Sequence, residues 1–316
     1  MTVPALPRAL PASATIGICA PSGWIADPAA LARSVHTLEA RGHQVRVMPG
    51  CLERDGYCAG TAARRLADLH ALVHDPAIDL VLAARGGFGL SHLLAHIDWA
   101  ACANSGKLFC GFSDFTAFHA GLYARTGQIS IAGPMATSDL ATEVPDPVHD
   151  RVFWPVLQQG AAGHTYPDWS SDQPVPDGEW QGTLWGGNLC LLAHLCGTPY
   201  LPAIDQGILF LEDIGEAPYR IERMLLQLDL AGVLARQQVI LLGAFTACEP
   251  PAGAIADYRL KAVIAALRMR FAGPVLTGLP FGHVRTKWTL PFGAQAQLRV
   301  EGAQAHLRVL PFLQGR

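Results

Sequence analysis

The sequence predicts an α/β protein in two parts, an N-terminal doubly wound parallel sheet and a C-terminal mixed β/α domain. The chain has 316 residues, about twice the ~150 residues of an average domain. Half of its residues are hydrophobic and only 16% are charged, so a large core can form. Strand-like and helix-like segments alternate through the first 145 residues, which is typical of parallel sheets whose strands are connected by helices.

The N-terminal part is predicted from these alternating segments. Short apolar runs that end in glycine, proline or polar residues predict strands at 15–23, 43–50, 78–89, 107–114 and 129–135. Apolar residues at helical spacing predict helices at 28–42, 61–75, 90–102 and 115–127. This order predicts a flavodoxin-like sheet with helices on both faces.

The pattern changes near residue 143. Residues 146–178 are predicted to be an inter-domain connection with one short helix near 148–159, because prolines crowd this region. These prolines lie at 145, 147, 155, 167, 174 and 176. The connection divides an N-terminal domain over 1–145 from a C-terminal domain over 179–316.

The C-terminal domain shows a less regular mixture of segments. Strands are predicted at 179–188, 207–215, 238–245, 274–283, 289–300 and 303–310. Helices are predicted at 189–198, 217–234 and 257–273. We expect a mixed β/α domain of the swivelling type.

Charge and hydropathy argue against several classes of protein. Lysine and arginine number 23 and aspartate and glutamate 26, and this net charge of −3 argues against a dedicated nucleic-acid binder. No apolar run approaches the ~18 residues of a membrane-spanning helix, so we expect no membrane partner. Pro4, Pro7 and Pro11 interrupt the N-terminal segment, so we expect no signal peptide.

The eight cysteines form no C-x-x-C pair, and most lie in apolar surroundings. Buried free thiols in a reducing compartment are therefore expected, with zinc ligands or disulfides as the alternatives. The histidines form no H-E-x-x-H motif, which argues against a zinc hydrolase, and we expect no metal or other cofactor. The cysteines lie at 19, 51, 58, 102, 110, 190, 196 and 248.

Two predicted strand ends in the N-terminal domain are candidates for chemistry, because ligand groups gather at the carboxyl ends of parallel strands. ARGGFG (84–89) fits no phosphate-binding motif, so it is either an oxyanion site or a structural turn. CGFSDF (110–115) indicates a strand-to-helix nucleophile elbow around Ser113, although Phe115 departs from the G-x-S-x-G pattern. Alternatively, Ser113 or Asp114 caps the following helix.

A third strand end, LFLEDIGE (209–216), supplies carboxylates. Glu212 follows four apolar residues, which favours a buried functional role, whereas Asp213 and Glu216 are equally compatible with capping a helix. His283 in LPFGHVR follows a strand and a glycine. It is the best candidate for a general base among the twelve histidines.

In this order, the motifs resemble the LD-carboxypeptidase family, serine peptidases that include muramoyltetrapeptide carboxypeptidases and microcin C immunity peptidases. The resemblance covers roughly residues 14–310, and only Phe88 and Phe112 depart from it, where tyrosine is expected to be common. It rests on ICAPSG, ARGGFGLSHLL, GFSDFTAFH, GTLWGGNLCLLAHLCGTPY, ILFLEDIGEAPYRIERMLLQL and LPFGH.

The resemblance implies a catalytic triad of Ser113, Glu212 and His283. It also implies an oxyanion hole made by the backbone amides of Gly87 and Asp114. The serine would come from the N-terminal domain and the other two residues from the C-terminal domain, so the site would lie between domains. A cytoplasmic homodimer is implied as well.

The implied substrate is a murein tetrapeptide, cut between meso-diaminopimelate and the terminal D-alanine during peptidoglycan recycling. Arg85 could bind a substrate carboxylate or form a structural ion pair. Trp185, Asn188 and Glu216 could line the binding cleft or serve as core, turn or cap residues. If Glu216 contacts the substrate, we expect it to pair with the diaminopimelate ammonium group.

Three other interpretations are kept. A microcin C immunity-type peptidase, which cleaves aminoacyl- or peptidyl-nucleotides, would share the triad and need an aromatic platform for adenine, for which Trp185 is a candidate. A muropeptide-binding protein without catalysis could lose triad residues, and all three are present here. A flavodoxin-like cofactor binder would have a similar N-terminal sheet and would bind flavin.

Overall fold

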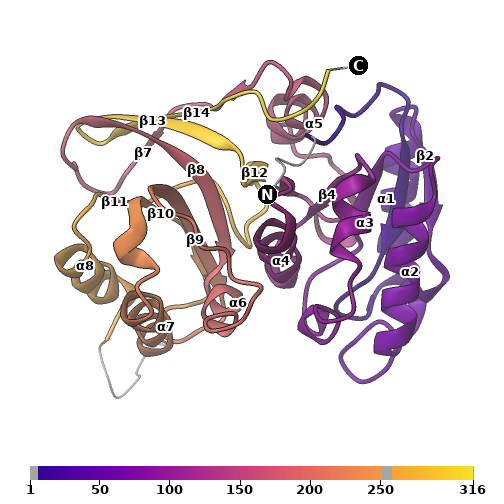
Figure 1. The fold of residues 1–316 in the computed structure, drawn as a ribbon, viewed down its shortest axis with the longest axis horizontal. Helices are drawn as coiled ribbons and strands as arrows, with labels where there is room; N and C mark the ends of the chain where they lie inside the picture. Colours follow the sequence, from indigo (N-terminus) through magenta and orange to yellow (C-terminus); the bar gives the residue numbers. More distant parts are fainter. Residues whose placement is uncertain (1–5, 251–257, 316) are drawn as a thin grey trace.

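Two sheets with flanking helices form the molecule, and the predicted α/β class is confirmed (Figure 1). The computed structural model describes residues 6–250 and 258–315. The first sheet has the strand order β12 (Leu290–Phe292), β5 (Ser130–Ala132), β4 (Leu108–Gly111), β3 (Leu80–Ala83), β1 (Thr15–Cys19) and β2 (Gln44–Val47).

Strands β1 to β5 of the first sheet are parallel and follow the flavodoxin-like order. Every residue of β3 and β4 is buried, as expected for strands that are covered on both faces. Side-chain caps begin two of the intervening helices, since Asp27 accepts from the Ala29 amide and Thr61 from the Arg64 amide. The helices are α1 (Pro28–Ala40), α2 (Ala62–His74), α3 (Trp99–Asn104) and α4 (Thr116–Thr126).

The second sheet is mixed. Its parallel part is β11 (Val275–Leu276), β10 (Gln237–Thr246), β9 (Gly207–Ile214) and β8 (Gly178–Asn188). Its antiparallel part continues with β13 (Gln295–Glu301), β14 (Gln304–Val309) and β6 (His164–Thr165), while β7 (Trp169–Ser170) also pairs with β14. Helices α6 (Leu189–His194), α7 (Pro218–Leu230) and α8 (Leu260–Arg270) lie beside the parallel strands (Figure 1).

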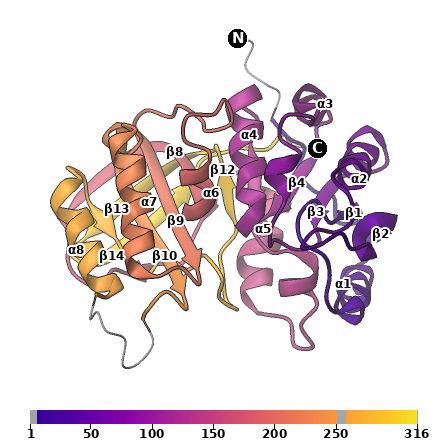
Figure 2. The ribbon, with the colours of Figure 1, turned by 90° about the horizontal axis from the view of Figure 1, so that it is seen from below.

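The two halves of the chain are joined by more than the connecting segment. Strand β12 comes from the C-terminal part of the sequence but pairs antiparallel with β5 of the first sheet. Figure 2 shows β12 in the middle of the molecule, where the sheets meet. Helix α4 packs against both α6 and β8 across the same junction. The end of β4, which leads into α4, is therefore held against the second sheet.

Several sequence-based expectations differ from the structure. Residues 90–102 form a 3₁₀ turn η2 (Leu90–His92) and the separate α3, because Asp98 caps a new helix by accepting from the Ala101 amide. Only Val275–Leu276 of 274–283 is a strand. The predicted connection contributes β6 and β7 to the second sheet, so it is more than a linker.

Short helical turns complete the described structure. They are η1 (Pro49–Leu52), η3 (Ser113–Phe115), η4 (Ala136–Leu140), η5 (His149–Phe153) and η6 (Leu234–Arg236), together with the helix α5 (Trp154–Gln159). Among residues 6–250 and 258–315, no helix combines the length and the apolar character needed to cross a bilayer.

Candidate active site

Ser113 lies on a tight turn between a strand and a helix. Strand β4 ends at Gly111, and η3 leads directly into α4. Ser113 has φ = +62°, a left-handed conformation that costs a residue other than glycine roughly 1–3 kcal/mol. A Cβ atom at Gly86 would lie 2.8 Å from Ser113 Oγ, so glycine is needed where the neighbouring turn faces the hydroxyl. This is the geometry of an elbow that presents a serine at the end of a strand.

His283 connects Ser113 with Glu212. Its Nε2 atom lies 2.9 Å from Ser113 Oγ, and its Nδ1 atom lies 2.7 Å from Glu212 Oε2. With Nδ1–H donating to the carboxylate, Nε2 is free to accept the serine proton. The Glu212 carboxylate is fully buried near the end of β9, and the His283 side chain is 17% exposed. The structure thus brings together the three residues predicted as a triad.

A buried network holds the Glu212 carboxylate. Asn188 Nδ2 donates to Glu212 Oε1 and to Asp213 Oδ1, each at 3.2 Å. Asp213 also accepts from the backbone amides of Ile214 and Cys190. Burial raises the pKa of Asp213 to about 6 despite these hydrogen bonds, and the neighbouring charge of Glu212 adds to the rise. Asn188 therefore separates two adjacent carboxylates and orients the one that contacts His283.

The glycine turn 84–89 lies against the elbow. The Asp114 side chain accepts from the Leu90 amide at 2.9 Å, which ties the end of this turn to the residue after Ser113. Burial raises the pKa of Asp114. Gly87 has φ = +108°, a conformation that favours glycine. Within the described residues, no protein group accepts a hydrogen bond from the Gly87 or Asp114 amide, so both remain available to a ligand oxygen.

Two cavities adjoin the Ser113–His283 pair. One, of about 310 Å³, is lined by Ser113, His283, Arg85, the glycine turn and small apolar residues of the β1–α1 connection. The other, of about 400 Å³, shares Phe112, Ser138 and His283 with the first and is otherwise largely polar and charged. A peptide bond placed at Ser113 would have room for the groups on either side of it.

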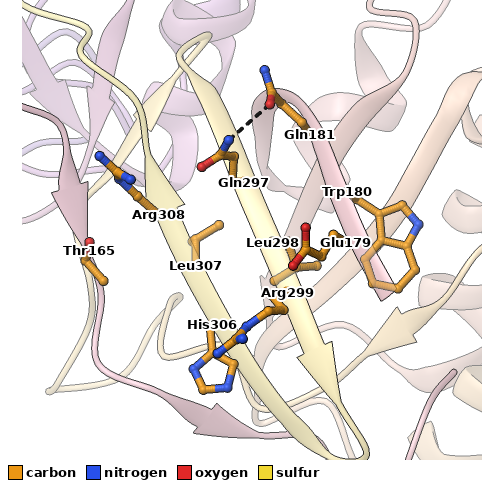
Figure 3. A pocket seen from close by; sticks show the side chains of 10 residues that line it. All are labelled: Thr165, Glu179, Trp180, Gln181, Gln297, Leu298, Arg299, His306, Leu307 and Arg308. Carbon is orange, nitrogen blue, oxygen red and sulfur yellow. Dashed lines mark hydrogen bonds between the residues drawn. The ribbon is translucent and has the colours of Figure 1, made fainter. Parts of the chain in front are cut away.

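A larger cavity, of about 540 Å³, lies elsewhere, on the outer face of the antiparallel strands (Figure 3). Its lining includes polar side chains such as Gln181 and Gln297, which hydrogen-bond to each other, and Arg299 and Arg308. None of the three triad residues lines it. We do not assign chemistry to this surface, because size alone does not supply a nucleophile and a base.

The sequence suggested four residues as substrate contacts, and the structure shows that they differ in burial and in their distance from the Ser113 cavity. Arg85 lines the cavity that contains Ser113. The prediction that Trp185 contacts substrate or stacks on adenine is wrong, because its side chain is 1% exposed and its Nε1 donates to Gln237. Asn188 is also buried, and its amide is used within the protein. Its Oδ1 accepts from the Leu191 amide, so the capping alternative is confirmed.

Glu216 lies outside both cavities that adjoin Ser113. Its side chain is 24% exposed and lies 3.7 Å from an Arg220 nitrogen, in an ion pair at the start of α7. The structure therefore does not bring Glu216 to Ser113 and His283.

One buried ion pair near the site was not predicted. Lys287 pairs with Asp139, although the two residues are far apart in the sequence, and both side chains are almost fully buried. Lys287 Nζ also lies 4.5 Å from the centre of the Phe112 ring, beside Ser113. No motif marks this contact, because it depends on how the segment after His283 packs against η4.

In the described residues, the cysteines and acidic residues do not cluster around a metal site. In the described part of the chain, no group of three or more His, Cys, Asp or Glu side chains is arranged to hold a metal ion. All eight cysteines are free, and six are buried, as predicted, whereas Cys190 and Cys196 are partly exposed.

Fold and site together define a serine hydrolase. Residues 16–133 match the LD-carboxypeptidase N-terminal domain, and residues 181–298 match the LD-carboxypeptidase C-terminal domain. The chain belongs to the LD-carboxypeptidase family, and it is an enzyme, a serine carboxypeptidase.

Three relatives illustrate the range of the family. The probable murein peptide carboxypeptidase of Bacillus subtilis is 34% identical over 92% of this chain and 91% of its own length. The crystal structure of muramoyltetrapeptide carboxypeptidase from Oxalobacter formigenes is 37% identical, with a TM-score of 0.86 over 95% of this chain and 100% of that one. The microcin C7 self-immunity protein of Escherichia coli is 28% identical over 83% of each chain.

Proposed function

We propose that the protein is an L,D-carboxypeptidase that releases the terminal D-alanine from murein tetrapeptides by hydrolysing its bond to meso-diaminopimelate. The observation that carries the proposal is the unbroken chain of contacts from Ser113 Oγ through His283 to the buried Glu212. Relatives named for murein peptide and muramoyltetrapeptide carboxypeptidase activity support the substrate class.

In the proposed mechanism, Ser113 Oγ attacks the carbonyl carbon of the scissile bond while His283 Nε2 takes the serine proton. The amides of Gly87 and Asp114 stabilise the oxyanion that forms, and Glu212 stabilises the imidazolium. The C–N bond then breaks, and the histidine returns the proton to the amine of the leaving D-alanine. A water molecule hydrolyses the acyl-enzyme by the same steps and restores the Ser113 hydroxyl.

Release of D-alanine from UDP-MurNAc-tetrapeptide, with EDTA present, tests this proposal. We expect wild-type enzyme to release D-alanine, and Ser113→Ala to lose at least about 10³-fold in kcat, because the nucleophile is absent. Equal release by both proteins would contradict the mechanism.

The microcin C immunity-type activity is the second candidate, and the similarity to the Escherichia coli self-immunity protein supports it. It would use the same triad on an aminoacyl- or peptidyl-nucleotide. The burial of Trp185 removes the aromatic platform that the sequence offered for adenine. We therefore favour the murein peptide. Hydrolysis of an aminoacyl-nucleotide analogue, with no D-alanine released from the tetrapeptide, would reverse this choice.

Several further assignments belong to this proposal. We propose a cytoplasmic homodimer, which light scattering and cell fractionation can test. Residues 1–145 would supply the nucleophile, residues 179–316 the base and its acid partner, and 146–178 the connection. A contact between Glu216 and the diaminopimelate ammonium remains a prediction, and an unchanged KM in Glu216→Gln would remove it. A purified protein without bound flavin would count against the cofactor-binding alternative.

A further inference from the structure

Arg85 lies beside Ser113 and, within the described residues, has no acidic partner. It is half-buried on the glycine turn and lines the 310 Å³ cavity, yet it forms no ion pair with any acid in the described residues. The structure shows one hydrogen bond from its side chain, from Nη1 to the Trp24 carbonyl oxygen at 2.8 Å. A guanidinium has five N–H donors, so most of its hydrogen-bonding capacity remains for a ligand.

The charges around the two cavities differ. The 400 Å³ cavity has two acids, Asp139 and Asp146, and two cations, Arg285 and Lys287, so its formal charges cancel. In the 310 Å³ cavity the only acid is Asp27, which pairs with Arg33 outside the lining at 3.1 Å. The positive charge of Arg85 therefore has no counterpart, which favours an anionic ligand in this cavity.

The position of Arg85 relative to Ser113 restricts which residue of the substrate can carry the negatively charged group. A Cβ at Gly86 would meet Ser113 Oγ at 2.8 Å, and a Cβ at Gly87 would lie 3.5 Å from Arg85 Nη2. The hydroxyl and the guanidinium thus face consecutive residues of one turn, and consecutive Cα atoms lie ~3.8 Å apart. A carboxylate on the residue directly after the scissile bond can reach Arg85 while the carbonyl is at Ser113.

Much of the rest of the cavity is apolar, although Thr137 and Ser138 also line it. Ile25, Ala26 and Ala30 form one side of its lining, and Met135 lies in it as well. This apolar part of the lining suits a methyl side chain, and the one acid of the lining, Asp27, is already paired with Arg33. The cavity therefore combines a guanidinium for a carboxylate with a wall for a small apolar side chain.

We propose that the 310 Å³ cavity holds the leaving C-terminal residue and that Arg85 binds its α-carboxylate, which restricts the enzyme to substrates with a free C-terminus. This inference rests on the proposed carboxypeptidase function and adds the residue that makes it an exopeptidase. Arg85 binds and positions the substrate and takes no part in the proton transfers.

The test compares tetrapeptide that ends in D-alanine with the same peptide ending in D-alaninamide. Wild-type enzyme should prefer the free acid by roughly 10- to 100-fold in kcat/KM, the size expected for charge-assisted hydrogen bonds. Arg85→Gln should lose most of this preference by slowing reaction with the acid while the amide reacts as before. Arg85→Lys should keep part of the preference, because it retains the charge without the planar fork.

A matched control is Arg299→Gln, which removes an exposed arginine from the outer face of the second sheet (Figure 3). It should leave the acid preference unchanged. A second measurement does not depend on the stability of the Arg85 variants. Free D-alanine should inhibit the wild type more strongly than D-alaninamide, since the amide lacks the carboxylate.

The outcomes separate this inference from the proposed function. In one outcome, the wild type releases D-alanine while Arg85→Gln keeps the preference for the free acid. That result overturns the role of Arg85 and leaves the proposed carboxypeptidase function standing. If Arg85→Gln loses a preference of the wild type for diaminopimelate over lysine but keeps the preference for the free acid, Arg85 contacts the acyl side of the scissile bond. This result also overturns the proposed role of Arg85. No release of D-alanine by the wild type from any tetrapeptide rejects the proposed function itself.

Discussion

His119 is fully buried next to the elbow. Its Nε2 atom lies 2.9 Å from the Gly111 carbonyl oxygen, and its Nδ1 atom lies 2.8 Å from Ser130 Oγ. Both contacts are satisfied by a neutral ring that donates from Nε2 and accepts at Nδ1. Burial lowers the pKa of His119 to about 4 from the ordinary 6.5. The folded state therefore excludes a proton that the unfolded chain binds at mildly acidic pH.

This difference predicts that stability is lost as the pH falls from 6.5 toward 4. At pH 5 the loss from His119 amounts to roughly 2 kcal/mol of unfolding free energy. Urea unfolding of wild type and His119→Gln at pH 7.5 and pH 5 measures it. The wild type should lose about 2 kcal/mol more than the variant, since glutamine does not titrate. Equal losses would show that His119 is not kept neutral by the fold.

At the level of single residues, the geometry supports the predicted triad, whereas of the four predicted substrate contacts only Arg85 lines a cavity beside Ser113. The triad of Ser113, Glu212 and His283 was implied by the resemblance of several motifs to the LD-carboxypeptidase family, and the structure places these side chains within hydrogen-bond distance. Trp185 was wrong because its position in a strand does not reveal which face it occupies, and it packs inward against the core. Whether an aromatic side chain contacts substrate depends on burial, which the sequence does not give.

At the scale of elements, the segment that carries His283 is tied to the region after β5. Thr286 Oγ1 donates to Asp146 Oδ2, and Arg285 donates to the Val144 carbonyl oxygen at 3.3 Å. The buried Lys287–Asp139 pair fastens the end of the segment. These contacts restrict the loop that presents the imidazole to Ser113, so we expect them to affect the rate of the proposed reaction without touching the substrate.

Lys287→Met should destabilise the protein by roughly 3 kcal/mol, because it leaves the Asp139 carboxylate buried without its cation. It should also lower kcat, because the loop that positions His283 becomes less restricted. Adding Asp139→Asn should recover most of the stability, since the amide keeps an acceptor for the Met135 amide and carries no charge. Urea unfolding and kcat of the two variants check this. If Lys287→Met alone is as stable as the wild type, the Lys287–Asp139 pair does not have the stabilising role assigned to it.

Elements were predictable where local patterns decide them. The strands and helices of the first sheet follow apolar runs and caps such as Asp27 and Thr61. The prediction of one helix over residues 90–102 was wrong. The hydrogen bond from the Leu90 amide to Asp114 and the helix cap at Asp98 interrupt it. The pairing of β12 with β5 joins segments about 160 residues apart in the chain, and no local pattern reports such a pairing.

At the scale of the whole molecule, the two halves share structure. Strand β12 extends the first sheet, and the Ala9 amide donates to the Gln314 carbonyl oxygen, which joins the two ends of the described chain. The hydrogen-bonded group of Ser113, His283 and Glu212 also spans the halves. We therefore expect the sheets to unfold together rather than as independent domains.

Scanning calorimetry tests this expectation. A single transition, with the calorimetric enthalpy equal to the van't Hoff enthalpy, is predicted. A fragment of residues 1–145 should not fold alone, because it lacks the strand that covers the edge of β5. Two separate transitions, or a folded fragment, would contradict the shared structure. The division into 1–145 and 179–316 predicted from proline content would then describe independent domains.

The central claim is that Ser113 is the nucleophile of a triad. Its most direct test is mass spectrometry of the enzyme after reaction with a fluorophosphonate, a reagent that modifies activated serines. We predict one adduct, on the peptide that contains Ser113, forming in step with the loss of D-alanine release and much more slowly in His283→Ala. An active wild-type enzyme that stays unlabelled at Ser113, or one that is labelled there without losing activity, would contradict the claim.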